Sequence, residues 1–256
     1  MDKESFPPPL LISSTGMKYA VISDIHSNLE ALTRVLGEVG REGADKIICL
    51  GDVVGYGADP NECVRLVRER CDACLIGNHD SVACGLEEPE FFNPMARDAA
   101  LWTRAVLSED NKEYLRSLPS KLEIGGFVIV HGAISHPDKY ITSPRDAAQE
   151  FALMQSVSLC FFGHTHVMGC YRLREGRLEF TKEHGISVEH GAKYLVNPGS
   201  VGQPRDRDPR ASFLIFEPEG GRINFFRIDY DIERAQRKIV EAGLDPRLAL
   251  RLSYGF

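Results

Sequence analysis

The 256-residue sequence lacks any long apolar run, since no stretch approaches the roughly 18 consecutive apolar residues that a membrane-spanning helix needs. It also lacks an excess of basic residues, because 30 Lys and Arg stand against 37 Asp and Glu, for a formal charge of −7. Broad binding to nucleic acid or to anionic membranes needs a basic face. We therefore expect no membrane partner and no broad nucleic-acid binding. A small anionic substrate stays compatible with this charge where bound metal ions supply local positive charge.

Cysteine is too scarce and too irregular for a disulfide framework, since the chain has seven cysteines, an odd number for a chain this long. Cys49 and Cys160 lie inside apolar runs, where free cysteine packs as a small hydrophobic residue. Cys71 and Cys74 have the C-x-x-C spacing of some redox and metal sites, but no second pair completes a zinc site. We favour packing for this pair, and we expect a cytoplasmic protein because free cysteines are typical of a reducing compartment.

The first 16 residues also lack the marks of a secretory signal peptide. They combine charges of both signs, three consecutive prolines and a short apolar run at residues 10–12. That run is shorter than a signal-peptide core, and the segment before it is not basic. We expect residues 1–16 to form a disordered extension.

Apolar runs that are typical of buried strands alternate with helical patterns in the first half of the chain, as in βαβ units. Five such strands are expected, at residues 19–22, 47–50, 73–76, 127–130 and 159–162. Asn28 can cap a helix with an apolar stripe, which Gly40 and Gly43 should end. Pro60 similarly occupies the first position of a second helix, which Arg70 closes.

Antiparallel pairs become more frequent in the second half. Gly125-Gly126 lies between two strand patterns and predicts a hairpin. Further strands are expected at residues 170–173, 178–182, 194–196, 212–216 and 223–228, and helices at 231–242 and 247–252. We therefore expect one mixed α/β (α+β) domain at residues 17–230, with the helices of residues 231–256 packed on it.

Residues about 87–119 depart from this alternation. Asn93-Pro94 is typical of a cap and first helical turn, and Ser108 to Asp110 opens a second helix with an acidic first turn. Because this helical pair lies between two polar clusters, we interpret it as an insertion that forms a lid or a substrate wall. The alternative is a packing subdomain remote from any site.

Five short polar clusters follow the five apolar strands and hold nearly every good metal ligand of the chain. They are Asp24-Ile25-His26, Gly51-Asp52, Gly77-Asn78-His79-Asp80, His131-Gly132 and Gly163-His164-Thr165-His166. Each of these side chains alone would be better explained as a helix cap, a turn residue or an isolated histidine. In an open α/β sheet, however, the carboxyl ends of the strands form the crevice where ligands bind. The clusters together therefore predict one site.

The donor atoms of these clusters predict metal binding. Carboxylate oxygens and imidazole nitrogens suit manganese, iron, zinc, nickel or cobalt, and no thiolate takes part. The candidate ligands are Asp24, His26, Asp52, Asn78, His131, His164 and His166. They are more numerous than one tetrahedral ion needs, so they imply two ions about 3.5–4 Å apart that share a carboxylate.

In this order the five clusters resemble the signature of the calcineurin-like metallophosphoesterases, and in particular their small prokaryotic phosphodiesterase and phosphatase members. The resemblance extends from Met17 to about Ile228. It implies a two-sheet sandwich flanked by helices (αββα). It also implies hydrolysis of a small phosphoester by a binuclear metal centre.

The resemblance also implies a role for each cluster residue. One metal would be held by Asp24, His26 and His166, and the other by Asn78, His131 and His164, with Asp52 as the bridge. His79 would face the scissile phosphate and stabilise charge or protonate the leaving oxygen, while Asp80 would orient its neighbours. A hydroxide shared by the metals would attack phosphorus in line.

Two arginines of related protein phosphatases and dinucleoside tetraphosphate hydrolases have no counterpart here. Those enzymes carry Asp-Arg-Gly after the second cluster and an arginine soon after the third, whereas residues 53–57 and 81–85 contain no arginine. This difference argues against phosphoprotein hydrolysis and slightly favours phosphodiesters. The alternatives are a phosphomonoesterase or nucleotide phosphatase, and a non-catalytic interaction module on the same fold.

Three residues outside the clusters are candidate substrate contacts. Arg205 follows a Gly-rich bend at residues 197–202 and can hold a phosphate oxygen as a forked donor. The alternative for Arg205 is a salt-bridged position in a surface loop. Asn93 and Arg97, at the start of the helical insertion, are weaker candidates. His136, His184 and His190 have no such support and are interpreted as surface or loop residues.

Overall fold

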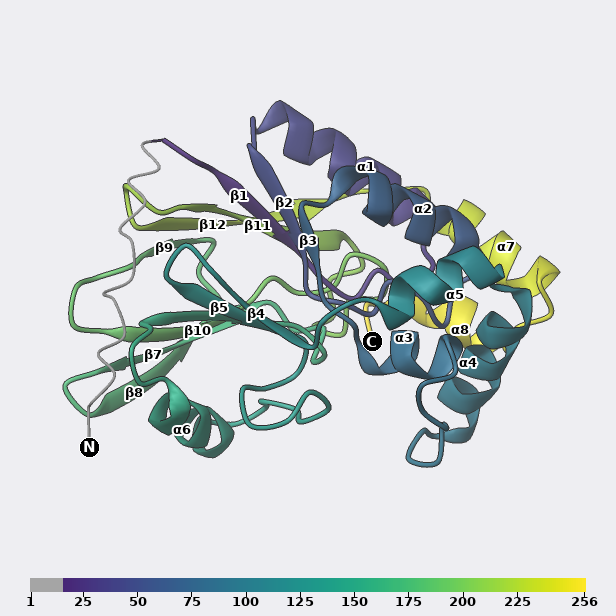
Figure 1. Cartoon of the computed structure of the whole chain (residues 1–256). Coiled ribbons are helices and arrows are strands. Elements are labelled where there is room, and N and C mark those ends of the chain that lie inside the picture. The colour runs from purple at the N-terminus through teal and green to yellow at the C-terminus, as the bar shows by residue number, and fades with distance from the viewer. Residues whose placement is uncertain (1–15) are drawn as a thin grey trace.

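Two six-stranded sheets form the centre of the protein in the computed structural model, which describes residues 16–256 (Figure 1). The strands are β1 (Tyr19–Ile22), β2 (Lys46–Cys49), β3 (Ala73–Cys74), β4 (Lys121–Ile124), β5 (Phe127–Val130), β6 (Leu159–Phe162), β7 (Gly169–Arg174), β8 (Arg177–Thr181), β9 (Gly185–Ser187), β10 (Lys193–Asn197), β11 (Ala211–Glu217) and β12 (Arg222–Ile228). The first sheet has the order β3-β2-β1-β11-β12-β9 and the second has the order β4-β5-β6-β10-β7-β8.

Helices cover the outer faces of both sheets. They are α1 (Leu29–Arg41), α2 (Pro60–Arg70), α3 (Asn78–Ala83), α4 (Pro94–Val106), α5 (Glu109–Arg116), α6 (Pro144–Leu153), α7 (Ile232–Glu241) and α8 (Pro246–Leu252). Figure 1 shows α1 and α2 above the first sheet and α6 below the second. This is the αββα sandwich that the sequence predicts, so the expected fold class is confirmed.

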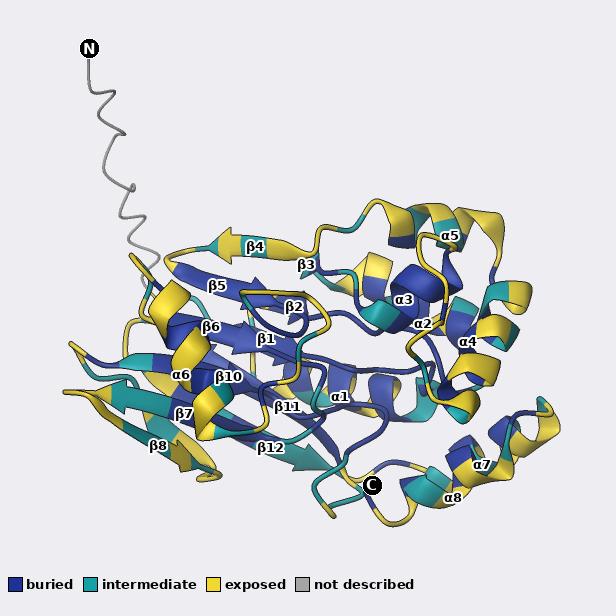
Figure 2. Cartoon of the chain, turned by 90° about the horizontal axis from the view of Figure 1, so that it is seen from below, coloured by how far each residue is buried: buried dark blue, intermediate teal, exposed yellow. Residues whose placement is uncertain are grey.

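The strands at the centre are apolar on both faces, because each sheet has helices on its outer face and the other sheet on its inner face. In β5, Phe127 and Ile129 point into the layer between the sheets, while Val128 and Val130 point toward α6. In β1 the side chains of Ala20 and Ile22 instead pack under the helices of the first sheet. Strands buried on both faces need continuous apolar sequences, which explains the five apolar runs (Figure 2).

Parallel pairing gathers the carboxyl ends of the strands that carry the polar clusters. β2 pairs in parallel with β1 and β3, and β6 pairs in parallel with β5 and β10, whereas the other pairs are antiparallel. The loops after β1, β2 and β3 therefore leave one edge of the first sheet. Hydrogen bonds join them directly, since the Asp24 amide donates to the Gly51 carbonyl and the His26 amide donates to the Asp52 carbonyl, both at 3.0 Å.

The N-terminal boundary of α1 agrees with the sequence and its C-terminal boundary does not. The Asn28 side chain accepts the Ala31 amide at 3.1 Å and caps the helix. Gly40 was expected to end α1 but lies inside it, and the helix continues to Arg41. The chain turns at Gly43, whose φ of +68° is readily adopted by glycine.

The third strand is shorter than expected, and a short helix follows it from Asn78. β3 ends at Cys74 rather than Ile76, because the Ile76 amide donates to the Pro119 carbonyl at 3.0 Å instead of extending the ladder with β2. Asn78, His79 and Asp80 then form the first turn of α3. The cluster that follows this strand is therefore helical.

The sequence analysis missed α6 and β9. The signal for α6 was present, because Ser143 caps the helix, Pro144 occupies its first position and Asp146 completes a capping box. β9 pairs with β12 at the edge of the first sheet. It has only three residues, too few to show a period-2 pattern. The two C-terminal helices lie where they were expected.

Helices α4 and α5 of the insertion pack against α2 and α3 and contribute to the apolar layer over the first sheet. The prediction of a disordered extension concerns residues 1–16, of which 1–15 lie outside the described part of the chain. Within residues 16–256, no helix is both long enough and apolar enough to cross a membrane.

Candidate metal centre

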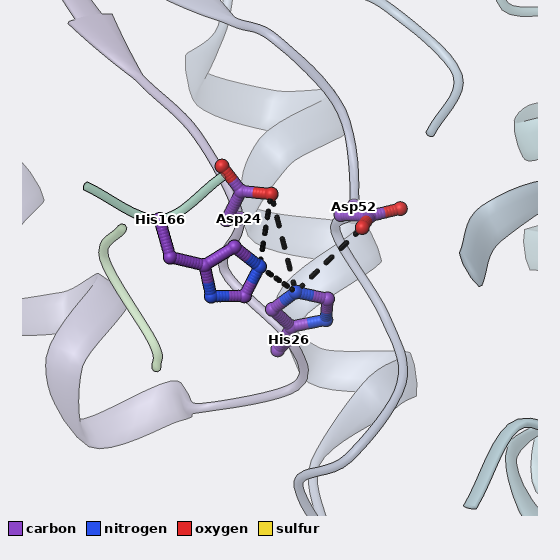
Figure 3. A group of neighbouring side chains, drawn as sticks. All are labelled: Asp24, His26, Asp52 and His166. Atoms are coloured by element: carbon purple, nitrogen blue, oxygen red, sulfur yellow. Dashed lines mark hydrogen bonds and ion pairs between the residues drawn. The ribbon is translucent and has the colours of Figure 1, made fainter. Parts of the chain in front are cut away.

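The side chains of Asp24, His26, Asp52 and His166 meet at the ends of β1, β2 and β6, and all four are buried (Figure 3). One potential ligand atom from each lies within 4.8 Å of the others. His166 Nε2 is 3.4 Å from Asp24 Oδ1, and His26 Nε2 is 3.6 Å from Asp52 Oδ2. Two carboxylates and two imidazoles thus surround one point.

Asp52 also belongs to a second group, which it forms with His131 and His164. The same atom, Asp52 Oδ2, is 3.3 Å from His131 Nε2. Asn78 Oδ1 lies 3.3 Å from that histidine nitrogen and extends the group. One carboxylate therefore joins two clusters of ligand atoms, as the sequence predicted for a bridging residue.

Backbone carbonyls determine which nitrogen of each histidine is free. His26, His131 and His166 donate from Nδ1 to the carbonyls of Val54, Leu50 and Gln203, at 3.0, 3.0 and 2.6 Å. His164 instead donates from Nε2 to the Asp138 carbonyl at 3.1 Å. A carbonyl oxygen can only accept, so in each neutral ring the other nitrogen keeps its lone pair for a metal.

The pair of His26 and His166 fits a cation between them. Their Nε2 atoms are 3.1 Å apart, although both lone pairs point inward when the rings are neutral. Burial lowers the pKa of both histidines well below the usual value, which favours neutral rings. Two facing lone pairs repel unless a positive ion lies between them. The donor set and this arrangement together fit a divalent transition metal.

Asp52 concentrates negative charge at the junction of the two groups. Burial alone would raise its pKa, but His131, His79 and His26 outweigh burial and hold the pKa of Asp52 well below its usual range. Burial opposes a charge on His131 as well, yet the Asp52 carboxylate raises the pKa of His131 to about 10, so without a cation this ring holds a proton that a bound metal would replace. Burial also raises the pKa of Asp24, to about 7. A cation bound here would stabilise both carboxylates in their charged form.

Five of the seven candidate ligands have left-handed backbone conformations. They are Asp24, His26, Asp52, His164 and His166, with φ between 49° and 64°. Such conformations cost on the order of 1–3 kcal/mol each for residues other than glycine and tend to mark functional sites. The loop-to-loop hydrogen bonds hold them in place, so the fold supplies the energy that this ligand geometry requires.

Several supporting residues were not predicted. Asn197 donates from its amide to the Gly163 carbonyl at 2.8 Å, and Ser200 donates to the Asp24 carbonyl at 2.7 Å. Both lie just after or at the end of β10, where the sequence showed only a Gly-rich bend. Asp80, predicted to orient its neighbours, accepts the amides of Val54 and Gly77 at 3.0 Å each. Asp80 thereby connects the loop that follows the second cluster to the backbone of the third.

His79 lies beside the ligands rather than among them. Its ring is 4.9 Å from that of His26 and packs against Tyr56 and Phe92 at 4.4 and 4.6 Å between centroids. Its amide donates to Asp52 Oδ1 at 2.9 Å, while its buried Nδ1 has no hydrogen-bond partner among the described residues. The Nδ1 atom is packed against Gly55, where an added Cβ would lie 2.5 Å from it.

The candidate substrate residues have different positions. Arg205 reaches Gln203 Oε1 at 3.0 Å and lies 5.8 Å from the Tyr56 ring, so it is close to the centre and forms no salt bridge with the described acids. Asn93 lines a cavity beside the centre but also caps α4. Arg97 is exposed and does not line that cavity. Tyr56 and Tyr140 were missed, although Tyr56 lies in a Gly-Tyr-Gly run that marks a close turn.

Comparisons with known proteins agree with this geometry. The model of the calcineurin-like phosphoesterase superfamily domain matches residues 17–221. An uncharacterised protein of Methanocaldococcus jannaschii is 42% identical over 240 residues, which are 92% of this chain and 97% of that protein. A metallophosphoesterase from Sphaerobacter thermophilus of known crystal structure is also 42% identical, with a TM-score of 0.83 over 94% of this chain and 99% of that chain. A hypothetical protein from Pyrococcus horikoshii, 20% identical, shares the fold with a TM-score of 0.76 over 94% of this chain and 99% of its own.

Proposed function

The chain belongs to the calcineurin-like phosphoesterase superfamily and is a metallophosphoesterase, and we propose that it hydrolyses phosphodiesters in preference to phosphomonoesters. The observation that supports hydrolysis at a binuclear centre is the position of Asp52, whose Oδ2 lies 3.6 Å from His26 Nε2 and 3.3 Å from His131 Nε2. One carboxylate shared by two ligand groups supports a binuclear site rather than two separate ones. The preference for diesters rests on the lining of the neighbouring cavity, which has no cationic side chain among the described residues.

The two ligand groups would divide the metals as follows. Asp24, His26 and His166 would hold one ion, Asn78, His131 and His164 would hold the other, and Asp52 would contact both. When bound, such ions supply an activated water near neutral pH and neutralise charge on the phosphoryl oxygens. The donor atoms are compatible with manganese, iron, zinc or nickel.

His79 would act on the leaving group. Its ring borders both the ligand cluster and the neighbouring cavity, so an ester oxygen that leaves toward the cavity passes within reach of the ring. The burial that lowers its pKa to about 4 also ensures a neutral ring in the absence of substrate. An approaching phosphate would favour the protonated form, and general acid catalysis of this kind typically contributes ~10²–10⁴-fold.

Arg205 would bind a phosphate oxygen and help to set the preference for diesters. Among the described residues, no lysine or arginine lines the cavity next to the ligands. A phosphomonoester carries about one more negative charge than a diester at neutral pH, so it needs more cationic contacts. A cavity lined by no cationic side chain among the described residues therefore favours the diester, which accords with the two arginines that the sequence lacks.

The expected setting is a reducing cytoplasm with a small phosphoester as the partner. All seven cysteines are free, and six of them are buried. Burial raises the pKa of the Cys63 thiol well above its usual value, which makes it a poor nucleophile. These thiols therefore support a packing role. Expression with a tagged chain followed by fractionation would test the location.

The proposed activity is tested with bis(p-nitrophenyl) phosphate and p-nitrophenyl phosphate in the presence of manganese. We expect turnover of both, with the larger kcat/KM for the diester, loss of activity with a chelator and recovery with added manganese. A larger value for the monoester would instead indicate a phosphomonoesterase. Absence of turnover of either ester by protein with two metals bound would contradict the proposed hydrolysis.

A further inference from the structure

A cavity of about 190 Å³ opens beside the metal ligands, and its walls differ sharply from the centre itself. His79, Asn78 and His164 form its inner end. The loop before α4 and the segment around Tyr140 form its outer end. An ester bound at the centre with its alcohol directed past His79 would place that alcohol in this cavity.

Aromatic rings line the cavity from the inner end to the rim. Tyr56 and Phe92 pack on His79, and the Tyr140 ring lies 3.8 Å from the His164 ring between centroids. Phe91 stands at the rim with 99% of its surface exposed, and Tyr140 is 48% exposed. Exposure of a whole phenylalanine side chain is unfavourable unless a partner covers it. These rings give the cavity an aromatic lining.

Two carboxylates at the outer end lack a cationic partner. Glu88 is paired with Arg104, but Glu87 and Asp138, which also line the cavity, form no salt bridge with any described residue. Burial and the charge of Asp138 together raise the pKa of Glu87, and the opposing effect of His136 is smaller. Two like charges held close without compensation favour a bound cation.

The lining of the cavity carries acidic side chains and no cationic one among the described residues. Arg205 lies 5.8 Å from the Tyr56 ring and does not line the cavity, whereas Glu87 and Asp138 do. We propose that this cavity binds the alcohol moiety of the phosphoester and selects one that carries an alkylammonium cation. This inference rests on the proposed function and names its substrate class. Aromatic faces with nearby carboxylates bind such cations through the ring quadrupole and by charge.

The inference is tested with esters that differ only in the charge of the alcohol. p-Nitrophenyl phosphocholine is compared with p-nitrophenyl 3,3-dimethylbutyl phosphate, in which a carbon atom replaces the ammonium nitrogen. Phosphorus NMR identifies which P–O bond is cleaved. Water adds to phosphorus, and either the alkyl alcohol leaves with a proton or p-nitrophenolate leaves as the anion while the proton from water is released to solvent. We expect kcat/KM to be about tenfold higher for the choline ester, from cation–π and charge contacts.

Variants of residues that line the cavity test whether the cavity causes the preference for the choline ester. Glu87→Gln removes one of the two carboxylates and should lower the ratio of the two kcat/KM values well below ten. Glu90→Gln is the matched control, because Glu90 is exposed in the same loop and does not line the cavity. The control should keep the tenfold ratio. Phe91→Leu, which keeps apolar surface but removes the ring, should lower the ratio to an intermediate value.

Binding without turnover separates this inference from the proposed function. Calorimetry on the metal-loaded protein compares 3-(trimethylammonio)propylphosphonate with 4,4-dimethylpentylphosphonate, its neutral isostere. Tighter binding of the cation without hydrolysis of any ester would contradict the proposed function and support the cavity assignment. Equal affinities and equal kcat/KM values, with both esters hydrolysed, would overturn the inference and leave the proposed function intact.

Discussion

The metal centre and the cavity beside it are built on opposite principles. The centre consists of buried side chains on loops that hydrogen bond to one another, and five of its ligands have strained backbone conformations. The outer end of the cavity consists of exposed side chains such as Phe91 and Glu87 on the loop before α4. The comparison teaches that the reaction depends on the interior of the fold, while substrate choice depends on a surface segment that can vary without disturbing it.

Replacement of the shared carboxylate should have the largest effect, because it affects both halves of the centre. For Asp52→Asn we expect kcat/KM to fall by more than the ~10²–10⁴-fold that a general acid alone contributes. Metal content per chain, measured by mass spectrometry of the purified protein, should fall with it. Asp110→Asn, an exposed position on α5, is the matched control and should change neither. Full metal content with normal activity in the Asp52 variant would contradict a bridging role.

Replacement of His79 tests the residue that lies between the metal centre and the cavity. His79→Asn should lower kcat by ~10²–10⁴-fold for esters of alkyl alcohols, since these alcohols leave with a proton. The loss should be much smaller for p-nitrophenyl esters, whose leaving group needs no proton. Two metals should remain bound, because His79 is not a ligand. Equal losses with both kinds of ester would argue against a general acid role.

Gly77 tests how tightly the interior supports the ligands. A Cβ atom at this position would lie 2.1 Å from Asp52 Oδ1 and 2.4 Å from the Asp52 amide nitrogen. We expect Gly77→Ala to displace Asp52 and weaken metal binding by about 10–100-fold, the usual effect of disturbing the support of a ligand. Gly37→Ala, where nothing lies within 4 Å of the added carbon, is the control. Metal titration of both variants gives the comparison.

Arg205 lies between the two regions and should affect binding more than chemistry. We expect Arg205→Ala to raise KM for bis(p-nitrophenyl) phosphate by about tenfold, as for loss of a charged hydrogen bond. Metal content should not change. Arg97→Ala, at the exposed start of α4, should leave KM within about twofold. An unchanged KM for the Arg205 variant would remove this residue from the substrate site.

The smallest expected effect concerns the loop after β5, in which the Asp138 carbonyl accepts a hydrogen bond from His164. Glu150 on α6 accepts hydrogen bonds from the Ser135 amide, the Ser135 hydroxyl and Lys139, at 2.9, 2.6 and 2.8 Å. Burial raises its pKa, but Lys139 and Ser135 outweigh burial and hold the pKa of Glu150 below its usual value. A lowered pKa adds stability above the unfolded value of about 4.3, and this stability is lost as the pH falls through the folded value.

We therefore expect Glu150→Gln to lower the free energy of unfolding by about 1–2 kcal/mol at pH 7 and by less as the pH falls below about 4. Urea titrations at both pH values measure the difference. Glu113→Gln, at an exposed position on α5, should show no such pH dependence. If the variant lost more unfolding free energy at low pH than at pH 7, the lowered pKa of Glu150 would be contradicted.

The elements that sequence reasoning predicted well are those with strong local signals. The five apolar strands, the cap at Asn28 and the proline at residue 60 all belong to this class. The misses have different causes. The β3 strand ends early because the Ile76 amide bonds to a distant carbonyl, and no local pattern reports such a partner. α6 was missed although its capping box was visible.

The site could be predicted only in part for the same reason. The candidate ligands are visible because they follow the strands directly, and the parallel pairing of those strands brings them together. Tyr140 was missed because nothing near it in the sequence indicates that its ring stacks on His164. Glu87 and Asp138 are ordinary surface acids until the fold places them at one cavity.

The sequence by itself predicted a mixed α/β fold and a set of candidate metal ligands, because strand periodicity and donor residues at strand ends are local features. The two-sheet arrangement and the reaction class came from the order of the five clusters, which resembles a known family. Only the tertiary structure decided which nitrogen of each histidine is free, which carboxylate is shared and what surrounds the leaving group. Those properties depend on contacts between residues more than 25 positions apart, such as His26 with Val54 and His166 with Gln203. Contacts at that range follow from how the sheets and loops pack.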